Sequence, residues 1–313
     1  MSQCAPVTPH GRSLVLAASR AFRQTCGLEQ AQPVSCVSAR PRPVSTEDLM
    51  PPSPVSGPAP EFRVLGVKVH ALQIPDAVRV LAGWRSEDPE RFRYVSSTNF
   101  HNVARAGESD AYREVMDCCD LSLPDSVPIL WYARRHGFVL PNRCGIEEVM
   151  VALFDLSEQG RDYRHFFYGN TPEVLDALKA NLAKQWPRLS VVGFRSPPFR
   201  PLSPEEDRAD VAAINQARPD FLWVSLGCPR QETWLYEHRH VLNGMVGGGA
   251  GAVFDFLAGQ KPKAPRIVQK LGLEWLLRLA TEPKRLSRRY LVLYPRHLLR
   301  LIREELIRPR HNR

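Results

Sequence analysis

The sequence predicts an α/β fold, in which a parallel sheet has helices on both faces and is followed by a basic amphipathic helical appendage. Three observations predict it. Between residues 61 and 260, short apolar strands alternate with amphipathic helices, the pattern of strands joined by helices. From residue 261 onward the pattern is helical only, with arginine at nearly every turn. Residues 1–60 hold ten of the 28 prolines and no periodic apolar pattern, so we expect a disordered segment there.

Each element of the 61–260 domain is predicted from its own pattern. Apolar runs and alternations predict strands at residues 62–72 (a strand or a hairpin), 93–98, 121–124, 166–168, 189–194, 221–226 and 244–246. Helical periodicity predicts helices at residues 76–84, 127–136, 172–185, 204–217, 230–240 and 251–257, with another helical stretch after residue 100. Pro172 and Pro204 occupy first-turn positions after Thr171 and Ser203, which are good N-caps. In the appendage we expect helices at residues 266–279 and 284–307, interrupted at Pro283 and Pro295.

The composition is that of a globular protein, with 43% hydrophobic and 24% charged residues. No run approaches the roughly 18–20 apolar residues that span a bilayer, and the apolar patch at residues 14–18 is too short for a secretory signal. The seven cysteines lack the spacing of a metal site or a disulfide framework. We therefore expect a cytoplasmic protein with reduced thiols.

The positive charge is concentrated at the C-terminus. Residues 261–313 carry 15 Lys and Arg against four Glu, a net charge of +11, which leaves −2 for the rest of the chain. Such a surplus predicts an anionic partner: a lipid surface, a diphosphate or a nucleic acid. Because Trp275, Leu276 and Tyr290 lie among these basic residues, the pattern fits a helix docked on an anionic membrane surface.

Polar residues follow two predicted strands at the points where these strands end. Ser97 and Asn99 follow the 93–98 strand, and Asp125 follows the 121–124 strand. Ligands of parallel sheets bind at the carboxyl ends of strands, so we expect these residues to form two walls of one site. Arg143 offers a planar fork of donors suited to a diphosphate or a carboxylate. The alternatives are helix capping for Asp125 and Asn99, and a surface ion pair for Arg143.

Glycine turns follow the later strands. Gly169 opens a strand-to-helix turn, and Gly227 opens another that places Gln231 at a helix start, where it could bind the uracil or ribose of a nucleotide. For Glu232 we predict the role of an acidic residue in the first turn of a helix, where it interacts favourably with the helix dipole. The glycines at 247–251 match the dinucleotide-binding fingerprint only imperfectly, which disfavours a nicotinamide-dependent enzyme. The run instead favours a loop whose backbone lies close to a diphosphate, at Gly251 above all. Asp255 would either contact a ligand bound there or buttress the loop.

Several of these motifs together resemble the WecG/TagA/CpsF glycosyltransferases. The resemblance covers residues 62–305, in the order and spacing of that family. It rests on Ser97-Thr-Asn, Leu123-Pro-Asp125, Arg143-Cys-Gly145, Gly227-Cys-Pro-Arg-Gln-Glu232, Gly251-Ala-Val-Phe-Asp-Phe256, Ala264-Pro-Arg266 with Leu271 to Trp275, and Glu282-Pro-Lys-Arg285 with Arg289-Tyr290 and Pro295-Arg296. Where this sequence has Ser97 and Phe100-His101, the family usually has Thr and Pro-Glu; Ser97 keeps the hydroxyl, whereas the acidic residue is absent here.

The resemblance implies an inverting hexosyltransferase with a Rossmann-like sheet. It implies that Asp125 is the catalytic base, that Ser97, Asn99, Gln231, Gly227, Gly251 and Asp255 bind the donor, and that Arg143, Arg278, Arg285, Arg288 and Arg289 bind the diphosphate. The donor would be a UDP-sugar carrying N-acetylmannosamine, its uronic acid or glucuronic acid, and the acceptor a saccharide on a polyprenyl diphosphate used for a surface polysaccharide or exopolysaccharide. Neither a cofactor nor a metal is expected, because the sequence has no Asp-x-Asp motif. The enzyme would work at the inner face of the cytoplasmic membrane, with a homo-oligomer possible.

One alternative of another class is a basic nucleotide- or nucleic-acid-binding protein without transferase activity. It accounts for the C-terminal charge, but not for Asp125 or the glycine turns. Its affinity for an oligonucleotide would fall steeply with salt, and it would ignore UDP-sugars. We therefore expect no nucleic-acid partner.

Overall fold

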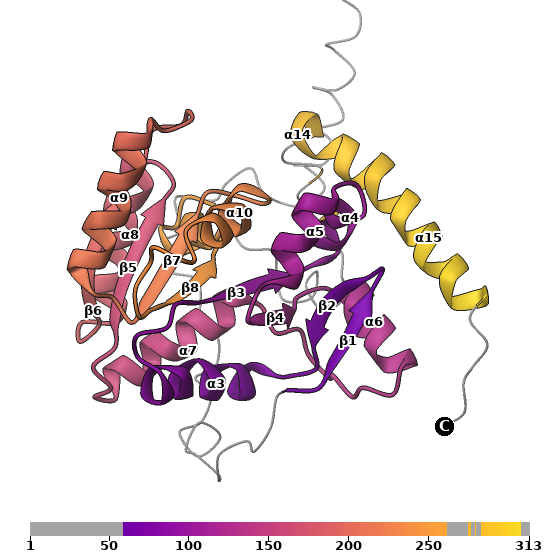
Figure 1. Cartoon of the computed structure of the whole chain (residues 1–313), viewed down its shortest axis with the longest axis horizontal. Coiled ribbons are helices and arrows are strands. Elements are labelled where there is room, and N and C mark those ends of the chain that lie inside the picture. Colours follow the sequence, from indigo (N-terminus) through magenta and orange to yellow (C-terminus); the bar gives the residue numbers. More distant parts are fainter. Residues whose placement is uncertain (1–58, 262–274, 277–278, 280–282, 308–313) are drawn as a thin grey trace, which may run out of the picture. The chain divides into compact units, whose positions relative to one another are not determined.

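Six parallel strands form the sheet that organises this computed structural model, which confirms the predicted fold class (Figure 1). The strands are β3 (Arg93–Thr98), β4 (Leu121–Pro124), β5 (Arg164–Gly169), β6 (Ser190–Arg195), β7 (Phe221–Ser225) and β8 (Val246–Gly249). Their order in the sheet is β4-β3-β8-β7-β5-β6, which the sequence pattern did not specify. The structure describes residues 59–261, 275–276, 279 and 283–307; the predicted N-terminal segment lies almost wholly outside them.

Helices cover both faces of the sheet (Figure 1). One face packs against α3 (Ile74–Glu87), α7 (Ile146–Glu158), α8 (Pro172–Gln185) and α11 (Val253–Leu257), in a core that includes Phe154, Phe167 and Trp223. The other face packs against α9 (Pro204–Ala217) and α10 (Arg230–Glu237). A third core gathers α4 (Phe100–Ala106), α5 (Asp110–Asp117) and α6 (Val127–Arg135). Burial of these apolar faces stabilises the layered arrangement.

Residues 61–70 form a hairpin, one of the two forms that the sequence allowed. β1 (Glu61–Val64) pairs antiparallel with β2 (Val67–His70), and the turn between them has positive φ at Leu65 and Gly66. Positive φ at both central residues suits the twist of a two-residue hairpin turn. His70 Nδ1 accepts a hydrogen bond from the backbone N–H of Ser122 across 2.9 Å, so the hairpin is fixed beside β4.

The two predicted N-caps are confirmed, together with the bounds of their helices. Thr171 Oγ1 accepts a hydrogen bond from the N–H of Val174 across 3.4 Å at the start of α8. Ser203 Oγ accepts from the N–H of Glu206 across 3.2 Å, and Glu206 Oε2 accepts from the N–H of Ser203 across 2.8 Å, a capping box at the start of α9. Both helices begin at the proline that follows the cap.

The prediction for the glycine run is wrong. The strand there is Val246–Gly249, so Gly247, Gly248 and Gly249 lie inside β8 rather than in a loop after it. A Cβ atom on Gly247 would lie 2.6 Å from Leu235, and one on Gly248 would lie 2.8 Å from Trp223. Large side chains on both faces of the sheet thus occupy the space that side chains of β8 would need, and close packing explains this run. α11 begins at Val253, after this longer strand, and is shorter than predicted; α10, which ends at Glu237, is also shorter than predicted.

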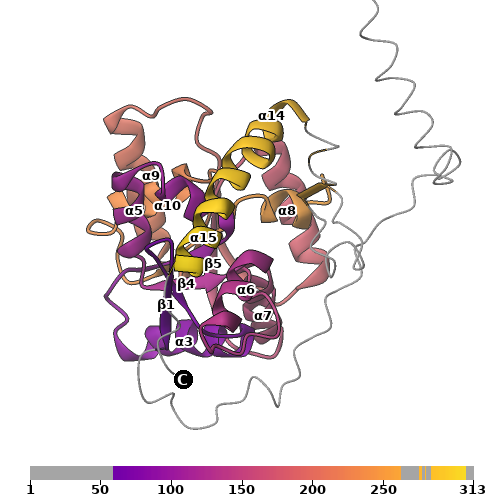
Figure 2. The ribbon, with the colours of Figure 1, turned by 90° about the vertical axis from the view of Figure 1, so that its right-hand side faces the viewer.

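The C-terminal helices pack against the sheet domain. α14 (Pro283–Ser287), the π-helical segment η2 (Arg288–Leu293) and α15 (Tyr294–Ile307) follow one another as one line of helix (Figure 2). Pro295 does not break the run; the wide turns of η2 precede it, because proline lacks the N–H that an α-helix would use there. The predicted 266–279 helix falls mostly outside the described residues. Within the described ranges, no helix is long and apolar enough to cross a membrane.

Candidate functional site

The ends of β3 and β4 bring Ser97, Asp125 and Arg143 together. In the register of these parallel strands, Ser97 lies opposite Leu123, so Asp125 emerges just beyond it. Ser97 Oγ donates a hydrogen bond to Asp125 Oδ2 across 2.8 Å, and an Arg143 guanidinium nitrogen lies 3.7 Å from Asp125 Oδ1. The side chains of Asp125 and Arg143 are 25% and 30% exposed, so both reach solvent. Ser97 and Asp125 thus come together as predicted for two walls of one site, and Arg143 joins them from the segment before α7.

Backbone contacts fix this group in place. The N–H of Cys144 donates to the carbonyl of Pro124 across 3.0 Å, and the N–H of Ile146 donates to Ser97 Oγ across 3.3 Å. A Cβ atom on Gly145 would lie 3.0 Å from Asp125 Oδ1, so glycine allows the close approach of this segment to the carboxylate. The N-cap of α6 is Ser126, and Asp125 therefore does not hold the capping position that was its alternative.

Asn99 is the N-cap of α4. Its Oδ1 accepts hydrogen bonds from the N–H groups of His101 across 2.9 Å and Asn102 across 3.4 Å. The capping alternative is thus confirmed, and a contact with the donor sugar remains a prediction. His101, in the first turn, is half-buried, and desolvation together with nearby arginines lowers its pKa to about 3, so it is neutral at physiological pH.

A second group of predicted residues surrounds the turn after β8. The N–H of Gln231 donates to the carbonyl of Gly227 across 3.0 Å, and Gln231 Oε1 accepts from the N–H of Gly251 across 2.9 Å. Gly227 and Gly251 both have positive φ, the conformation that glycine adopts most readily. Gln231 is buried, and it connects the other two predicted residues, Gly227 through its backbone N–H and Gly251 through its side chain.

Asp255 buttresses the turns at this end of the sheet, one of its two predicted roles. Its Oδ2 accepts a hydrogen bond from Asn170 Nδ2 across 3.3 Å, and its Oδ1 lies 3.4 Å from Lys261 Nζ. Ser225 Oγ donates to the carbonyl of Gly251 across 2.6 Å. The turns after β5, β7 and β8 are therefore tied together, while a contact of Asp255 with the donor remains a prediction.

The two groups lie along one edge of the sheet. β8 is the neighbour of β3, so the turn that holds Gly251 is two strand spacings, about 10 Å, from the end of β4. The chain crosses from β4 on one side of β8 to β5 on the other, which creates a topological switch point where ligands of such sheets bind. Ser97 continues the face of Val95 toward α7, whereas Gln231 reaches in from α10 on the other face.

The C-terminal arginines are placed only in part. Arg278 and the side chain of Arg285 lie outside the described residues, and Arg288 is exposed in η2. Arg289 donates to the Tyr294 hydroxyl across 2.8 and 3.0 Å, and its guanidinium lies over the rings of Tyr290 and Tyr294. Tyr294 packs edge-on against Phe100 at a centroid distance of 5.4 Å. Arg289 is thereby held near the start of α4, the helix that Asn99 caps.

Glu232 differs from its predicted role. It lies in the first turn of α10, but it is 1% exposed and accepts hydrogen bonds from three side chains. Burial raises the pKa of its carboxyl group. No local pattern distinguishes a buried first-turn glutamate from an exposed one, because the contacts that bury it come from α4 and α5, over 100 residues earlier in the sequence.

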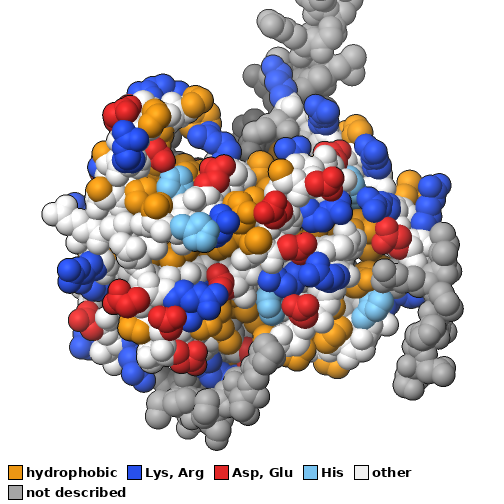
Figure 3. Space-filling view, in the orientation of Figure 1, with side chains coloured by type: hydrophobic (Ala, Val, Ile, Leu, Met, Phe, Trp, Pro, Cys, Tyr) orange, Lys and Arg blue, Asp and Glu red, His pale blue; other side chains and the backbone are white. Residues whose placement is uncertain are grey.

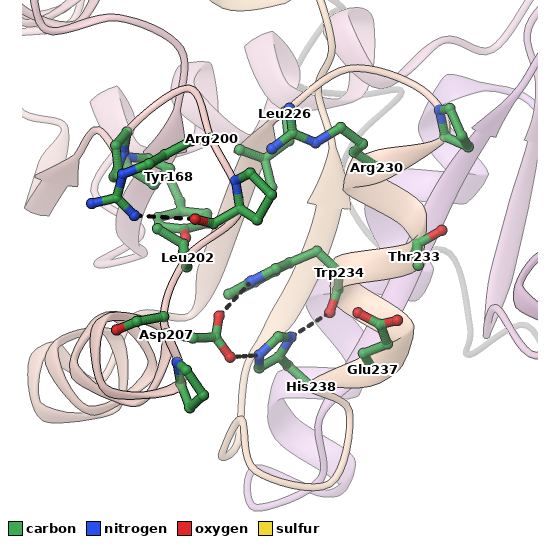
Figure 4. A pocket seen from close by; sticks show the side chains of 16 residues that line it. Tyr168, Arg200, Leu202, Asp207, Leu226, Arg230, Thr233, Trp234, Glu237 and His238 are labelled. Carbon is green, nitrogen blue, oxygen red and sulfur yellow. Dashed lines mark hydrogen bonds and ion pairs between the residues drawn. The ribbon is translucent and has the colours of Figure 1, made fainter.

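A separate cavity of about 540 Å³ lies between the loop after β6, α9 and α10. In Figure 4, Trp234, Asp207 and His238 are joined by hydrogen bonds on one side, with Arg200 and Arg230 on the other. Helical spacing places Arg230, Trp234 and Glu237 on the face of α10 opposite Glu232. None of the predicted site residues lines this cavity.

Comparisons with known proteins agree with the motifs and the fold. Residues 62–311 match the Glycosyl transferase WecG/TagA/CpsF family. Three similar proteins are each named N-acetylglucosaminyldiphosphoundecaprenol N-acetyl-beta-D-mannosaminyltransferase. The protein from Bacillus subtilis is 28% identical over 67% of this chain and 80% of its own length, that from Bacillus spizizenii 26% over 70% and 82%, and that from Staphylococcus aureus 27% over 62% and 74%. Since the family match spans most of the chain, this protein belongs to the WecG/TagA/CpsF family of glycosyltransferases.

Proposed function

We propose that this chain is an inverting glycosyltransferase that moves a sugar from a UDP-sugar to a saccharide carried on a polyprenyl diphosphate. The observation that carries the proposal is the pairing of Ser97 with Asp125 at adjoining strand ends, beside Arg143. The names of the relatives support an N-acetylglucosamine-diphospholipid acceptor and N-acetylmannosamine as the transferred sugar. The product would be a lipid-linked precursor of a cell-envelope polysaccharide.

Asp125 would act as the general base. Its carboxylate takes the proton from the attacking hydroxyl of the acceptor sugar as that oxygen bonds to the anomeric carbon of the donor. The bond between the anomeric carbon and the UDP oxygen breaks in the same displacement, which inverts the configuration and releases UDP. A single carboxylate suffices for this route. Ser97 Oγ, which donates to Asp125 Oδ2, would orient the carboxylate toward the acceptor hydroxyl.

Arginines would stabilise the leaving diphosphate in place of a metal ion. Arg143 lies 3.7 Å from Asp125, and Arg289 is held near the start of α4 by two tyrosine rings. A guanidinium pairs with phosphate oxygens through two parallel hydrogen bonds, so one such contact localises the charge that develops on the leaving group. Gln231 and the Gly251 turn would hold the nucleotide or its sugar about 10 Å away along the same edge.

The outer face of the C-terminal helices would dock on the membrane that carries the acceptor, at its cytoplasmic side. Tyr290, His297 and Leu301 are buried against the sheet domain. Between about 100° and 200° further around the helix, exposed apolar side chains form an outer stripe: Leu291, Val292, Leu298, Leu299 and Ile302. Basic side chains lie along the same helices (Figure 3). An apolar stripe flanked by cations is the pattern of helices that lie in the headgroup region of anionic bilayers.

A donor screen tests the proposed function. The purified full chain is incubated with an N-acetylglucosamine-diphosphopolyprenol and one UDP-sugar at a time, with N-acetylmannosamine, its uronic acid and glucuronic acid as the three sugars. Mass spectrometry of the lipid is expected to show that one sugar residue is added when one of the three UDP-sugars is present. The yield of this product should be the same in EDTA. Unmodified lipid with all three, together with tight salt-sensitive oligonucleotide binding, would favour the nucleic-acid alternative. A requirement for a divalent cation would refute the metal-independent route.

A further inference from the structure

A buried carboxyl group joins three elements beneath the candidate site. Glu232 is surrounded by donors from α10, α4 and α5: Gln231 Nε2 lies 2.9 Å and Asn102 Nδ2 3.4 Å from Oε1, and the Tyr112 hydroxyl lies 3.3 Å from Oε2. A buried carboxyl group without such donors would be strongly destabilising, so the three contacts explain how it is tolerated. No cation is among these partners.

One of these donors, Gln231, also holds the Gly251 turn. The two ends of its carboxamide face different groups, because Nε2 donates to Glu232 while Oε1 accepts from the N–H of Gly251 across 2.9 Å. A carboxamide rotated by 180° would set its oxygen against the carboxyl group and its NH₂ against an N–H, and both hydrogen bonds would be lost. Glu232 and the Gly251 N–H therefore fix together which way this amide points.

The same network reaches the other half of the site. Asn102 lies in α4, whose N-cap Asn99 follows the strand that carries Ser97. Asn102 Nδ2 also lies 3.6 Å from Cys228 Sγ, in the turn that begins at Gly227. One buried cluster thus contacts the helix after β3, the turn after β7 and, through Gln231, the turn after β8.

We propose that Glu232 is a positioning residue, which fixes the orientation of the Gln231 carboxamide and, through it, the Gly251 turn. The kinetic consequence rests on the proposed function, in which Gln231 contacts the donor. Gln231 Nε2 carries two N–H groups, and only one has an acceptor among the residues that the structure describes. The orientation set by Glu232 presents the other N–H to the nucleotide or sugar of the donor.

Two measurements on four proteins test the proposal. Glu232→Met removes the acceptor at similar volume, Glu232→Gln keeps an acceptor oxygen, and Glu237→Met changes an exposed glutamate of the same helix. Hydrogen exchange at the Gly251 amide, followed by NMR, should accelerate at least tenfold in Glu232→Met and less than threefold in the other two. The kcat/KM for transfer should fall about 100-fold in Glu232→Met alone, the scale of a misplacement of about 1 Å.

A double-mutant cycle separates positioning from general destabilisation. In a Gln231→Met background, Glu232→Met should cause little further loss of kcat/KM, because its effect passes through the missing amide. An additive loss, or unchanged exchange at Gly251, would overturn the proposal. If Glu232→Met does not fold, Glu232→Asp keeps a carboxyl group but withdraws it by one methylene and must change both readouts in the same direction. The exchange measurement needs no catalysis, so an inactive wild-type protein would refute the proposed function alone.

Discussion

Ser97 Oγ donates a hydrogen bond to Asp125 Oδ2 across 2.8 Å, from the end of one parallel strand to the end of its neighbour. The contact depends on register, because a shift of one residue between β3 and β4 would turn one of the two side chains to the other face of the sheet. Ser97 Oγ also accepts a hydrogen bond from the N–H of Ile146, so the hydroxyl joins both strands to the start of α7. We therefore expect the site to be sensitive to this one oxygen.

Replacing Ser97 by alanine should lower kcat for sugar transfer. A hydrogen bond to a charged group contributes about 1.5–3 kcal/mol, so the loss should be about 10- to 100-fold if the bond orients the base in the transition state. Ser97→Thr, which keeps the hydroxyl, should retain most of the rate. Steady-state kinetics with the lipid-linked acceptor provides the measurement; equal rates for the alanine and threonine variants would show that the hydroxyl has no such role.

Much of the fold was predictable because local chemistry determines it. α8 and α9 agree with their predicted bounds since Thr171-Pro172 and Ser203-Pro204 specify a cap and a first turn without help from distant residues. The pairing of Ser97 with Asp125 was predictable for a similar reason: both are polar residues at the carboxyl ends of apolar strands. The family resemblance then supplied the roles that spacing alone left open.

The remaining features depend on tertiary contacts that no local pattern encodes. The sequence pattern predicts a loop at Gly248, but the structure shows that Trp223 occupies the space beside this glycine in a strand. The pattern likewise predicts an exposed helix charge at Glu232, which Asn102 and Tyr112 contact in the interior. Strand order is equally non-local, because β8 inserts between β3 and β7 from the far end of the domain. The predictions failed at these positions because tertiary packing outweighs the local conformational preference of the residues.

Gly169→Ala should destabilise the protein more than Gly66→Ala. Both glycines have positive φ, but a Cβ atom on Gly169 would lie 2.5 Å from the carbonyl oxygen of Ser225, whereas one on Gly66 meets nothing within 4 Å. Strain from the backbone conformation alone is about 1 kcal/mol, and the clash should add at least about 2 kcal/mol at Gly169. Chemical denaturation of both variants measures the difference. Equal free energies of unfolding would contradict the close approach of the β5 and β7 turns.

His165 should contribute to acid sensitivity of the fold. It is 0% exposed and accepts a hydrogen bond from Trp223 Nε1, and burial lowers its pKa from 6.5 to about 3. Between these values the unfolded chain binds a proton that the folded chain does not, so stability falls as pH drops below 6.5. At pH 5 the loss from this residue is about 2 kcal/mol.

The variant His165→Asn keeps a hydrogen-bond acceptor for Trp223, but the asparagine side chain does not titrate. The free energy of unfolding of this variant should therefore decline less between pH 7 and pH 5 than that of the wild type, by about 2 kcal/mol. Denaturation curves at the two pH values give the comparison, and the pH-independent cost of the smaller side chain cancels. An identical decline in both proteins would show that the buried imidazole is not the titrating group.

Leu298→Ser combined with Ile302→Ser should weaken binding to anionic vesicles. Both side chains are exposed on the outer stripe of α15, so the fold should be unaffected, while the loss of apolar contact should lower the vesicle partition coefficient at least tenfold. Val139→Ser, at an apolar side chain that is 88% exposed outside the C-terminal helices, serves as the control and should change nothing. Co-sedimentation with phosphatidylglycerol-containing vesicles measures it. Undiminished binding of the double variant would exclude this stripe as the docking surface.

Transfer by Asp125→Asn, measured beside UDP-sugar binding by calorimetry, tests the role of Asp125 most directly. Asparagine keeps the shape and can still accept from Ser97, but it cannot take a proton from the acceptor hydroxyl. We predict donor affinity within about threefold of wild type and a rate of transfer lowered at least about 1,000-fold, within the range that a general base contributes. Turnover close to that of the wild type would contradict the assignment of Asp125 as the base.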